Sequence, residues 1–258
     1  MALLQSLYSC AELRGGMVKA SETYVLPLLD GARQYVVPLF QRTYSWGRPE
    51  WATLLSDIES LIDSPSAPSH FLGSIVTMPA PSGPEFPTVF LIDGQQRLTT
   101  LLILLAALRD GVKDSDAELG EKIDNRYLTN PFEKDRARYK LIPTRVDQKA
   151  FFDVMEGSPA SSHTISEAYK FFLAQIRKKP SAELAQLALA IVSQLVLVSI
   201  SLANDDNPYL IFESLNAKGR ELTQSDLIRN YFLMGGSPEA QEILYNTKWK
   251  PLDDYLPD

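Results

Sequence analysis

The chain has 258 residues, of which 45% are hydrophobic and 22% are charged, and its net charge is −7. These proportions are typical of a folded globular protein and exclude a disordered tail; the length suggests one or two domains. No run reaches the roughly 18 uninterrupted apolar residues of a membrane span, and the N-terminus shows no secretion signal, so we expect a cytoplasmic protein with no membrane partner. One cysteine and two histidines provide neither an internal disulfide nor a zinc centre of nitrogen and sulfur ligands.

The acidic balance argues against broad, salt-driven binding to the phosphate backbone of nucleic acid. A local basic face can still act inside an acidic protein. One stretch, residues 134–149, is rich in cations and is a candidate for such a face: Lys134, Arg136, Arg138, Lys140, Arg145 and Lys149. The alternative is a solvated helix face and loop.

The first 110 residues predict a compact mixed α/β unit. Residues up to about Ser21 show no strong period. The β-branched segment 34–39 contains Pro38 and predicts an edge strand. Pro49 and the helical spacing of apolar residues from Trp51 to Ile62 predict a helix. Strands are expected at 71–78 and 89–92, with a proline-rich loop between them.

A helix over 95–109 is apolar nearly all round, which is typical of a buried helix. Beyond it the chain is expected to be mostly helical, with helices at 121–138, 148–155, 165–178, 182–193 and 208–215 and a strand at 196–202. Thr223 and Asp226 have the spacing of a capping box that opens a further helix. The chain stops without a finishing element, so we expect the natural protein to continue.

The sharpest motif is Asp93-Gly94-Gln95-Gln96-Arg97, where a strand turns directly into the buried helix. The free N–H groups and the positive dipole end of a helix N-terminus favour an anion. Arg97 adds a rigid fork for phosphate, the glutamines add amide groups, and Asp93 can hold Mg²⁺ or orient a water molecule. The alternative is that Asp93 only caps the helix and Gly94 only makes the turn. The polar cluster on an otherwise apolar helix favours function.

A second cluster, residues 37–46, places aromatic, amide and guanidinium groups in a loop after a strand. Phe40, Tyr44 and Trp46 suggest a stacking or apolar pocket for a base, and Gln41 and Arg42 suggest contacts with phosphate or base edges. The alternative is a loop whose aromatic side chains anchor it to the core.

A third cluster, residues 207–222, surrounds a turn at Gly219. Asn216, Lys218 and Arg220 can close over phosphates there, or can be ordinary exposed residues of a helix–turn–helix connection. His70, at a strand start, is expected to be structural. The chain has no phosphate-binding loop of the Gly-x-x-x-x-Gly-Lys-Ser/Thr type and no catalytic triad spacing.

Four blocks, in this order, resemble the N-terminal domain of the GmrSD family of modification-dependent restriction proteins. They are Phe40-Gln41-Arg42 with Trp46, the segment from His70 to Ile75, the segment from Ile92 to Leu101, and the segment from Ile211 to Asn216 with Gly219 and Asp226-Leu227-Ile228. The resemblance runs from about Val36 to Tyr231. It implies an α+β fold, namely a ParB/sulfiredoxin-like α/β domain over 1–110 followed by a mostly helical region over 111–258 that completes the cleft.

The resemblance also implies binding and hydrolysis of a nucleoside triphosphate, often GTP, with Mg²⁺. Asp93 and Arg97 would be catalytic, with Asp93 holding the metal; the implied nucleotide contacts are Gly94, Gln95, Gln96, Arg97, Thr99, Asn216 and Lys218. The implied sensors of modified DNA are Phe40, Gln41, Arg42, Tyr44 and Trp46. Some members sense phosphorothioate DNA in anti-phage defence, and an apolar pocket would favour the poorly hydrated sulfur by desolvation. Phe40 stands at the position where the resemblance implies a tyrosine, in a Tyr-Gln-Arg motif.

Full-length members of the family carry a C-terminal HNH nuclease domain, whose histidine-rich segment this chain lacks. We therefore expect a module that couples nucleotide hydrolysis and DNA sensing to that nuclease, with homo-oligomerisation left open. The alternative is a non-hydrolysing nucleotide- or DNA-binding module that only switches a nuclease. A stand-alone nuclease is disfavoured because the histidine and metal-ligand pattern is missing.

Overall fold

The computed structural model describes residues 19–63, 69–80, 86–159, 162–203 and 243–249, together with Ala240 and Pro251. The third cluster, with Asn216 and Lys218, and the elements expected between 208 and 226 lie outside the described residues. Within the described ranges the protein is an α+β fold, as the sequence predicted.

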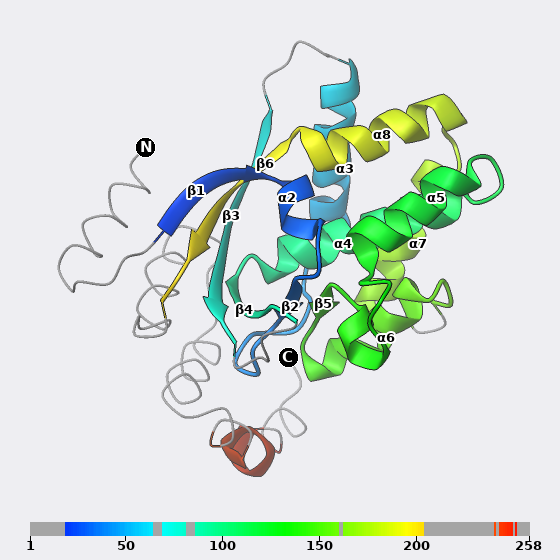
Figure 1. Ribbon diagram of the computed structural model, residues 1–258. Helices are drawn as coiled ribbons and strands as arrows, with labels where there is room; N and C mark the ends of the chain where they lie inside the picture. The colour runs from blue at the N-terminus through cyan, green and yellow to red at the C-terminus, as the bar shows by residue number, and fades with distance from the viewer. Residues whose placement is uncertain are drawn as a thin grey trace.

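A six-stranded mixed sheet has the order β1-β6-β3-β4-β2-β5 (Figure 1). Its strands, in that order, are Lys19–Tyr24, Leu195–Ser201, His70–Pro79, Thr88–Asp93, Gln34–Val36 and Leu141–Ile142. Strands β3 and β6 pair in parallel, as do β2 with β4 and β2 with β5, whereas β1–β6 and β3–β4 are antiparallel.

Strand β2 is not at an edge, so that prediction was wrong. Val36 is paired with Phe90 on one side and with Ile142 on the other. Pro38 was read as an edge marker, but the strand ends at Val36, before the proline can interrupt a ladder. The predicted strands at 71–78, 89–92 and 196–202 are confirmed as β3, β4 and β6.

The helices are α2 (Val25–Leu29), α3 (Arg48–Asp63), α4 (Gln95–Val112), α5 (Ala117–Ile123), α6 (Arg145–Met155), α7 (Thr164–Ile176) and α8 (Ser181–Ser193). The continuous helix expected over 121–138 was wrong. Helix α5 passes into the π-helical turn η1 (Asp124–Leu128) and stops, and only the 3-10 turn η2 (Asp135–Arg138) follows. Pro131 has no backbone N–H to donate and cannot continue a helix there. A further π-helical turn, η3 (Tyr245–Trp249), lies near the C-terminus.

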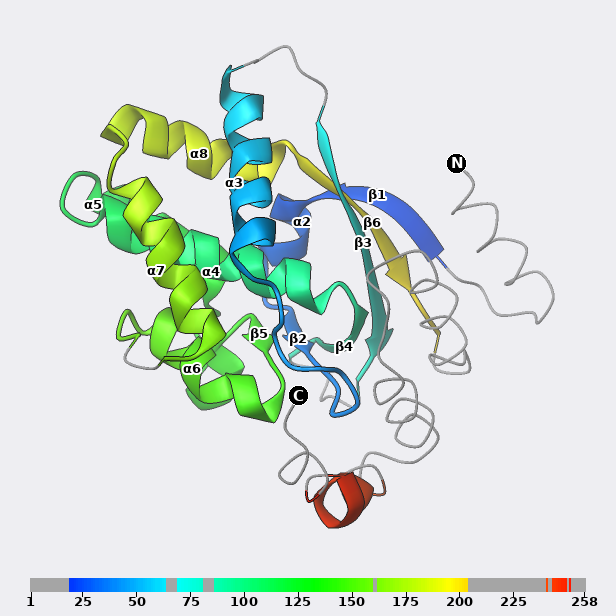
Figure 2. The same cartoon turned by 180° about the vertical axis from the view of Figure 1, so that it is seen from behind.

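Helix α4 is the centre of the main hydrophobic core, and its prediction as a buried helix is confirmed: apolar positions from Leu98 to Leu108 are at most 1% exposed. The helices gather on one side of the sheet, with α4 between it and α7 (Figures 1 and 2). A smaller apolar cluster of Phe40, Val76, Ile92, Ile200 and Leu202 forms a second core. Strands β5 and β6 come from beyond Asp110 but belong to the same sheet as β2 to β4.

Candidate functional site

The Asp93 carboxylate meets the Arg97 guanidinium where β4 ends and α4 begins. Arg97 Nη2 donates to Asp93 Oδ2 at 3.0 Å, and Ser74 Oγ donates to the same oxygen at 3.3 Å. The side chains are 18% and 22% exposed for Asp93 and Arg97. Oδ1 of Asp93 accepts no hydrogen bond from the described part of the chain. The pair is therefore anchored at one oxygen and open at the other.

Two glycines make room for this pair. Gly94 has φ 93°, and a Cβ there would lie 2.9 Å from the Ser74 carbonyl oxygen, so the turn requires glycine both for its backbone and for its close approach to β3. Gly73, on β3, has φ 121°, and a Cβ on it would lie 2.1 Å from Arg97 Nη1. The guanidinium therefore lies directly against the backbone of β3, which holds it beside Asp93.

The two glutamines of the motif hold a loop. Gln95 Nε2 donates to the Arg42 carbonyl at 3.0 Å, and Gln96 Nε2 donates to the Thr43 carbonyl at 3.0 Å. Gln96 Oε1 accepts from the backbone N–H groups of Ser45 (2.8 Å) and Trp46 (3.3 Å). Both glutamine residues are 8% exposed. In this structure the two side-chain amides form hydrogen bonds with the loop backbone and do not point to solvent, where a phosphate could reach them. We call residues 40–46 the clamped loop.

Two aromatic residues of the clamped loop, Phe40 at its start and Tyr44 within it, anchor it to the protein interior. Phe40 is 4% exposed in the second core, and Tyr44 is 6% exposed in the main core. The Tyr44 hydroxyl is hydrogen-bonded to Thr100 Oγ1 at 2.7 Å and accepts from Trp51 Nε1 at 2.8 Å, and burial raises the pKa of this phenol. Their rings are thus committed to the protein interior, the alternative that the sequence left open.

The remaining predicted sensors differ in exposure. Gln41 is buried and donates to the Ile92 carbonyl at 2.7 Å, immediately before Asp93. Arg42 and Trp46 are partly exposed, and Trp46 packs against the main core. Thr99, an expected nucleotide contact, is 3% exposed within α4. The structure therefore brings the first two clusters together, because Gln41, Gln95 and Gln96 join the clamped loop to the end of β4 and the first turn of α4.

Sequence reasoning missed Asp147, which holds the loop from the opposite side. Its Oδ2 accepts from the Tyr44 backbone N–H at 2.9 Å and from Thr144 Oγ1 at 2.5 Å. His163 Nε2 lies 3.4 Å from its Oδ1, and burial raises the pKa of the carboxyl. The Thr144-x-x-Asp147 spacing in the sequence is that of a capping box, and this pattern could have drawn attention to Asp147. His163 also caps α7, because its Nδ1 accepts from the Ile165 N–H at 3.2 Å.

No group of three potential metal-ligating His, Cys, Asp or Glu side chains occurs within the described ranges. No helix in those ranges combines the length and apolar character needed to cross a bilayer. A Mg²⁺ ion at this site would therefore depend mainly on a bound phosphate for its ligands, with Asp93 as the protein carboxylate.

These features define an α+β protein with a partly exposed acid–arginine pair at a strand-to-helix turn, next to a partly buried loop that the first turn of the helix holds. Residues 25–233 match the family model described as the GmrSD restriction endonuclease, N-terminal domain. The match covers most of the chain, which therefore belongs to the GmrSD family and is a module of a restriction system. A comparison with curated proteins found no match.

Proposed function

We propose that this domain binds and hydrolyses a nucleoside triphosphate, GTP or another, at the Asp93–Arg97 pair. Hydrolysis would be coupled to the sensing of modified DNA and, through it, to a C-terminal HNH nuclease domain. The observation that carries the proposal is the open geometry of this pair at the N-terminus of α4, on a turn that only glycine permits.

Three features of the turn suit a phosphate group. The first N–H groups of a helix have no acceptor within the helix, and the helix dipole adds positive potential. Arg97 presents a planar fork with five N–H donors, of which one contact goes to Asp93. Gly73 has no side chain, so the guanidinium can lie against the backbone of β3 and is held at the turn.

Asp93 fits a metal-bound nucleotide because its Oδ1 accepts no hydrogen bond from the described residues and carboxylate oxygen is a preferred ligand of Mg²⁺. Mg²⁺, when bound with the nucleotide, would neutralise charge on the phosphate oxygens. A phosphate at Arg97 would compete with Asp93 for the guanidinium donors. Loss of that ion pair would leave Asp93 free to orient the attacking water or the metal, which gives the pair a resting and an engaged arrangement.

Coupling to DNA has a direct route through the clamped loop. Gln95 and Gln96 belong to the first turn of α4 and hold the loop backbone from Arg42 to Trp46. A DNA contact that moves the loop therefore pulls on the same turn that carries Arg97. Since Phe40 and Tyr44 are buried, sensing of a phosphorothioate or another modification would fall to the outer residues, chiefly Arg42 and Trp46.

The second candidate is a non-hydrolysing module whose bound nucleotide or DNA only switches a nuclease. One observation favours it: Asp93 is already neutralised by Arg97 at 3.0 Å, and the glutamine amides are committed to the loop. With both committed in this way, the site would have groups that bind a nucleotide but no free carboxylate to act as the catalytic base.

The test is phosphate release from GTP and ATP with Mg²⁺, measured without DNA, with plain DNA and with phosphorothioate DNA. Hydrolysis should fall by at least about 100-fold in Asp93→Ala and in Arg97→Ala, as expected when groups that stabilise charge in the transition state are lost. Asp30→Ala is the matched control, because it removes an exposed carboxylate from a 2.7 Å contact with Arg126 elsewhere. Nucleotide binding without hydrolysis in the wild type would establish the second candidate instead.

A further inference from the structure

A second surface, far along the chain from Asp93, has the side-chain chemistry of a nucleotide-binding site. It is the segment 129–139, between η1 and β5, which we call the Phe132 loop. Thr129 and Tyr139 form an isolated antiparallel bridge that closes it. Within it, the Asn130 N–H donates to the Arg138 carbonyl at 2.6 Å, and Asn130 Nδ2 donates to the Ala137 carbonyl at 3.0 Å.

The loop is also fixed from outside. Gln34 Nε2, on β2, donates to the carbonyls of Arg136 (2.8 Å) and Tyr139 (2.9 Å). The Tyr139 ring stacks on Phe152 with 4.4 Å between centroids. These contacts hold the loop in one conformation before any ligand arrives, which lowers the entropy cost of binding.

This pre-organised loop presents Phe132 to solvent at 96% exposure, more than any other large hydrophobic residue in the described ranges. A phenylalanine ring in water forgoes about 1.5–3 kcal/mol of burial, so a ring with this exposure suits a partner that covers it. Asp135, three residues on, has φ 50°, a conformation that residues other than glycine rarely adopt and that often marks functional loops.

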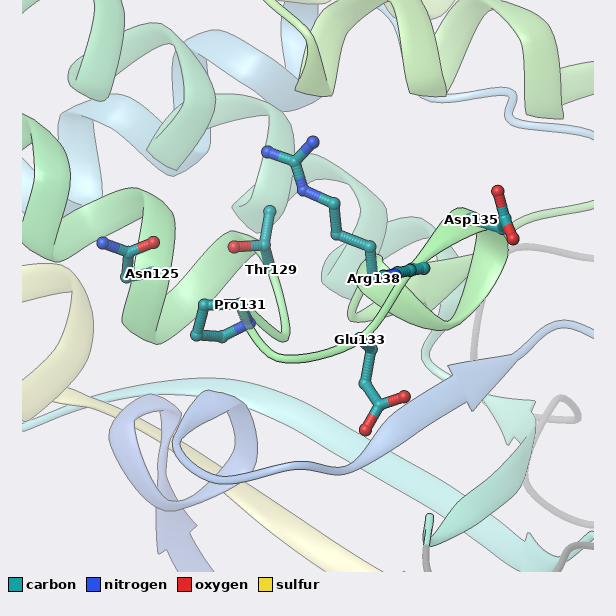
Figure 3. A pocket seen from close by; sticks show the side chains of 7 residues that line it. Asn125, Thr129, Pro131, Glu133, Asp135 and Arg138 are labelled. Carbon is teal, nitrogen blue, oxygen red and sulfur yellow. The ribbon is translucent and has the colours of Figure 1, made fainter.

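Other residues of the Phe132 loop line an open pocket of about 510 Å³ (Figure 3), although the Phe132 side chain itself does not line it. Pro131 and Glu133, which flank Phe132 in the sequence, both line it. Four charged residues of the loop, Glu133, Lys134, Asp135 and Arg138, line it as well. Arg138 is balanced by Glu156 at 3.4 Å, whereas Lys134 has no acidic partner among the described side chains.

These groups match the parts of one nucleotide. An exposed aromatic ring stacks on a base face, a lysine contacts a phosphate, and carboxylates accept hydrogen bonds from the exocyclic amine of a base such as cytosine. The two carboxylates would repel the phosphates of a DNA duplex, so this surface does not fit a site that contacts only the duplex backbone. A protein partner would also cover Phe132, but it would not require a cation beside base-type acceptors.

We propose that the Phe132 loop and its pocket bind an unpaired nucleotide of DNA, with Phe132 stacking on the base, Lys134 contacting the phosphate and Glu133 or Asp135 accepting from the base amine. The site is separate from the Asp93–Arg97 pair. It rests on the proposed function only in taking DNA as the ligand, and it makes part of the basic stretch 134–149 a DNA contact.

The experiment measures binding of the full chain to single-stranded oligodeoxycytidylate and oligothymidylate by fluorescence anisotropy over a range of salt concentrations. Phe132→Ala should weaken binding to oligodeoxycytidylate about tenfold, and Phe132→Trp should retain it. Lys134→Gln should reduce the slope of log affinity against log salt by about 0.7. Wild-type protein should prefer the cytosine polymer, and the double variant Glu133→Gln/Asp135→Asn should reduce that preference.

Leu189→Ala, which shortens a 61% exposed apolar side chain on α8, is the matched control and should bind both polymers as wild type does. Equal affinity of Phe132→Ala and wild type would overturn the proposal. A Phe132→Ala variant that changes only oligomeric state would overturn it in favour of a protein interface. Basal phosphate release by Phe132→Ala should match that of wild type. The binding experiment and the phosphate-release experiment therefore test the two proposals separately.

Discussion

Helix α4 carries an acid–arginine site at each end, and the two differ in how completely the arginine is satisfied. At the C-terminal end, Arg109 is 12% exposed and bonds both oxygens of Asp110, Oδ1 of Asp124 (2.7 Å) and the Met155 carbonyl (2.6 Å). At the N-terminal end, Arg97 is 22% exposed, and Asp93 is its only hydrogen-bonding partner among the described side chains. The first arrangement is closed, and the second retains bonding capacity for a ligand.

The difference shows that residue type alone does not indicate function. Arg109 links α4 to η1 and α6, and Tyr169 of α7 donates to Asp110 Oδ2 at 2.8 Å, so this site ties four elements together. Arg97 ties only β4 to the first turn of α4 and lies against Gly73. Changes at Arg109 should therefore act on stability, and changes around Arg97 should act on activity.

The largest effect on stability is expected for Arg109→Ala. Removing the guanidinium leaves Asp110 and Asp124 without their main partner in a mostly buried place, which typically costs about 3–5 kcal/mol. Urea unfolding followed by circular dichroism measures this loss. Arg126→Ala is the control, because Arg126 makes a bidentate contact with Asp30 on the surface, where ion pairs contribute little. Equal losses in both variants would show that the Arg109 contacts contribute no more stability than a surface ion pair.

Gln96→Ala should have an intermediate effect. It leaves the Thr43 carbonyl and the Ser45 and Trp46 N–H groups without their partner, at a cost of about 2 kcal/mol. Amide hydrogen exchange should quicken in the clamped loop before it quickens in α4. Gln175→Ala, which removes an amide that contacts only Lys178 at the surface, should leave exchange in the loop unchanged. Unaltered exchange in Gln96→Ala would show that Phe40 and Tyr44 hold the loop in place without the hydrogen bonds of Gln96.

The smallest effect on stability, with a large effect on activity, is expected for Gly73→Ala. Its positive φ costs about 1–2 kcal/mol for alanine, and the new Cβ collides with Arg97 Nη1, which moves away readily because it ends a flexible side chain. Gly31→Ala is the control, since it has φ 90° and no atom within 4 Å of the added Cβ. Both variants should lose similar stability, but only Gly73→Ala should lose phosphate release. Equal phosphate release by Gly73→Ala and Gly31→Ala would show that catalysis does not depend on the position of Arg97.

Much of the candidate site was predictable from local pattern, but the direction of its side chains was not. The turn at Gly94 and the helix after it follow from the Asp-Gly step and the apolar run, and both are confirmed. The role expected for Gln95 and Gln96 as phosphate contacts stays a prediction, since their amides face a loop 53 residues earlier in the chain. Phe40 and Tyr44 illustrate the same limit, because an aromatic residue in a loop is equally consistent with a ligand pocket and with an anchor.

The sequence by itself determined the elements whose signal is periodic: the buried helix α4, the strands β3, β4 and β6, and the glycine turn between β4 and α4. These follow from contacts between near neighbours and from the backbone freedom of glycine. Only the tertiary structure decided that β2 lies inside the sheet, that β6 enters it between β1 and β3, and that Asp147 holds the clamped loop. Those outcomes depend on pairing between residues distant in the chain, where the partner of each hydrogen-bonding group is chosen by the whole packed core.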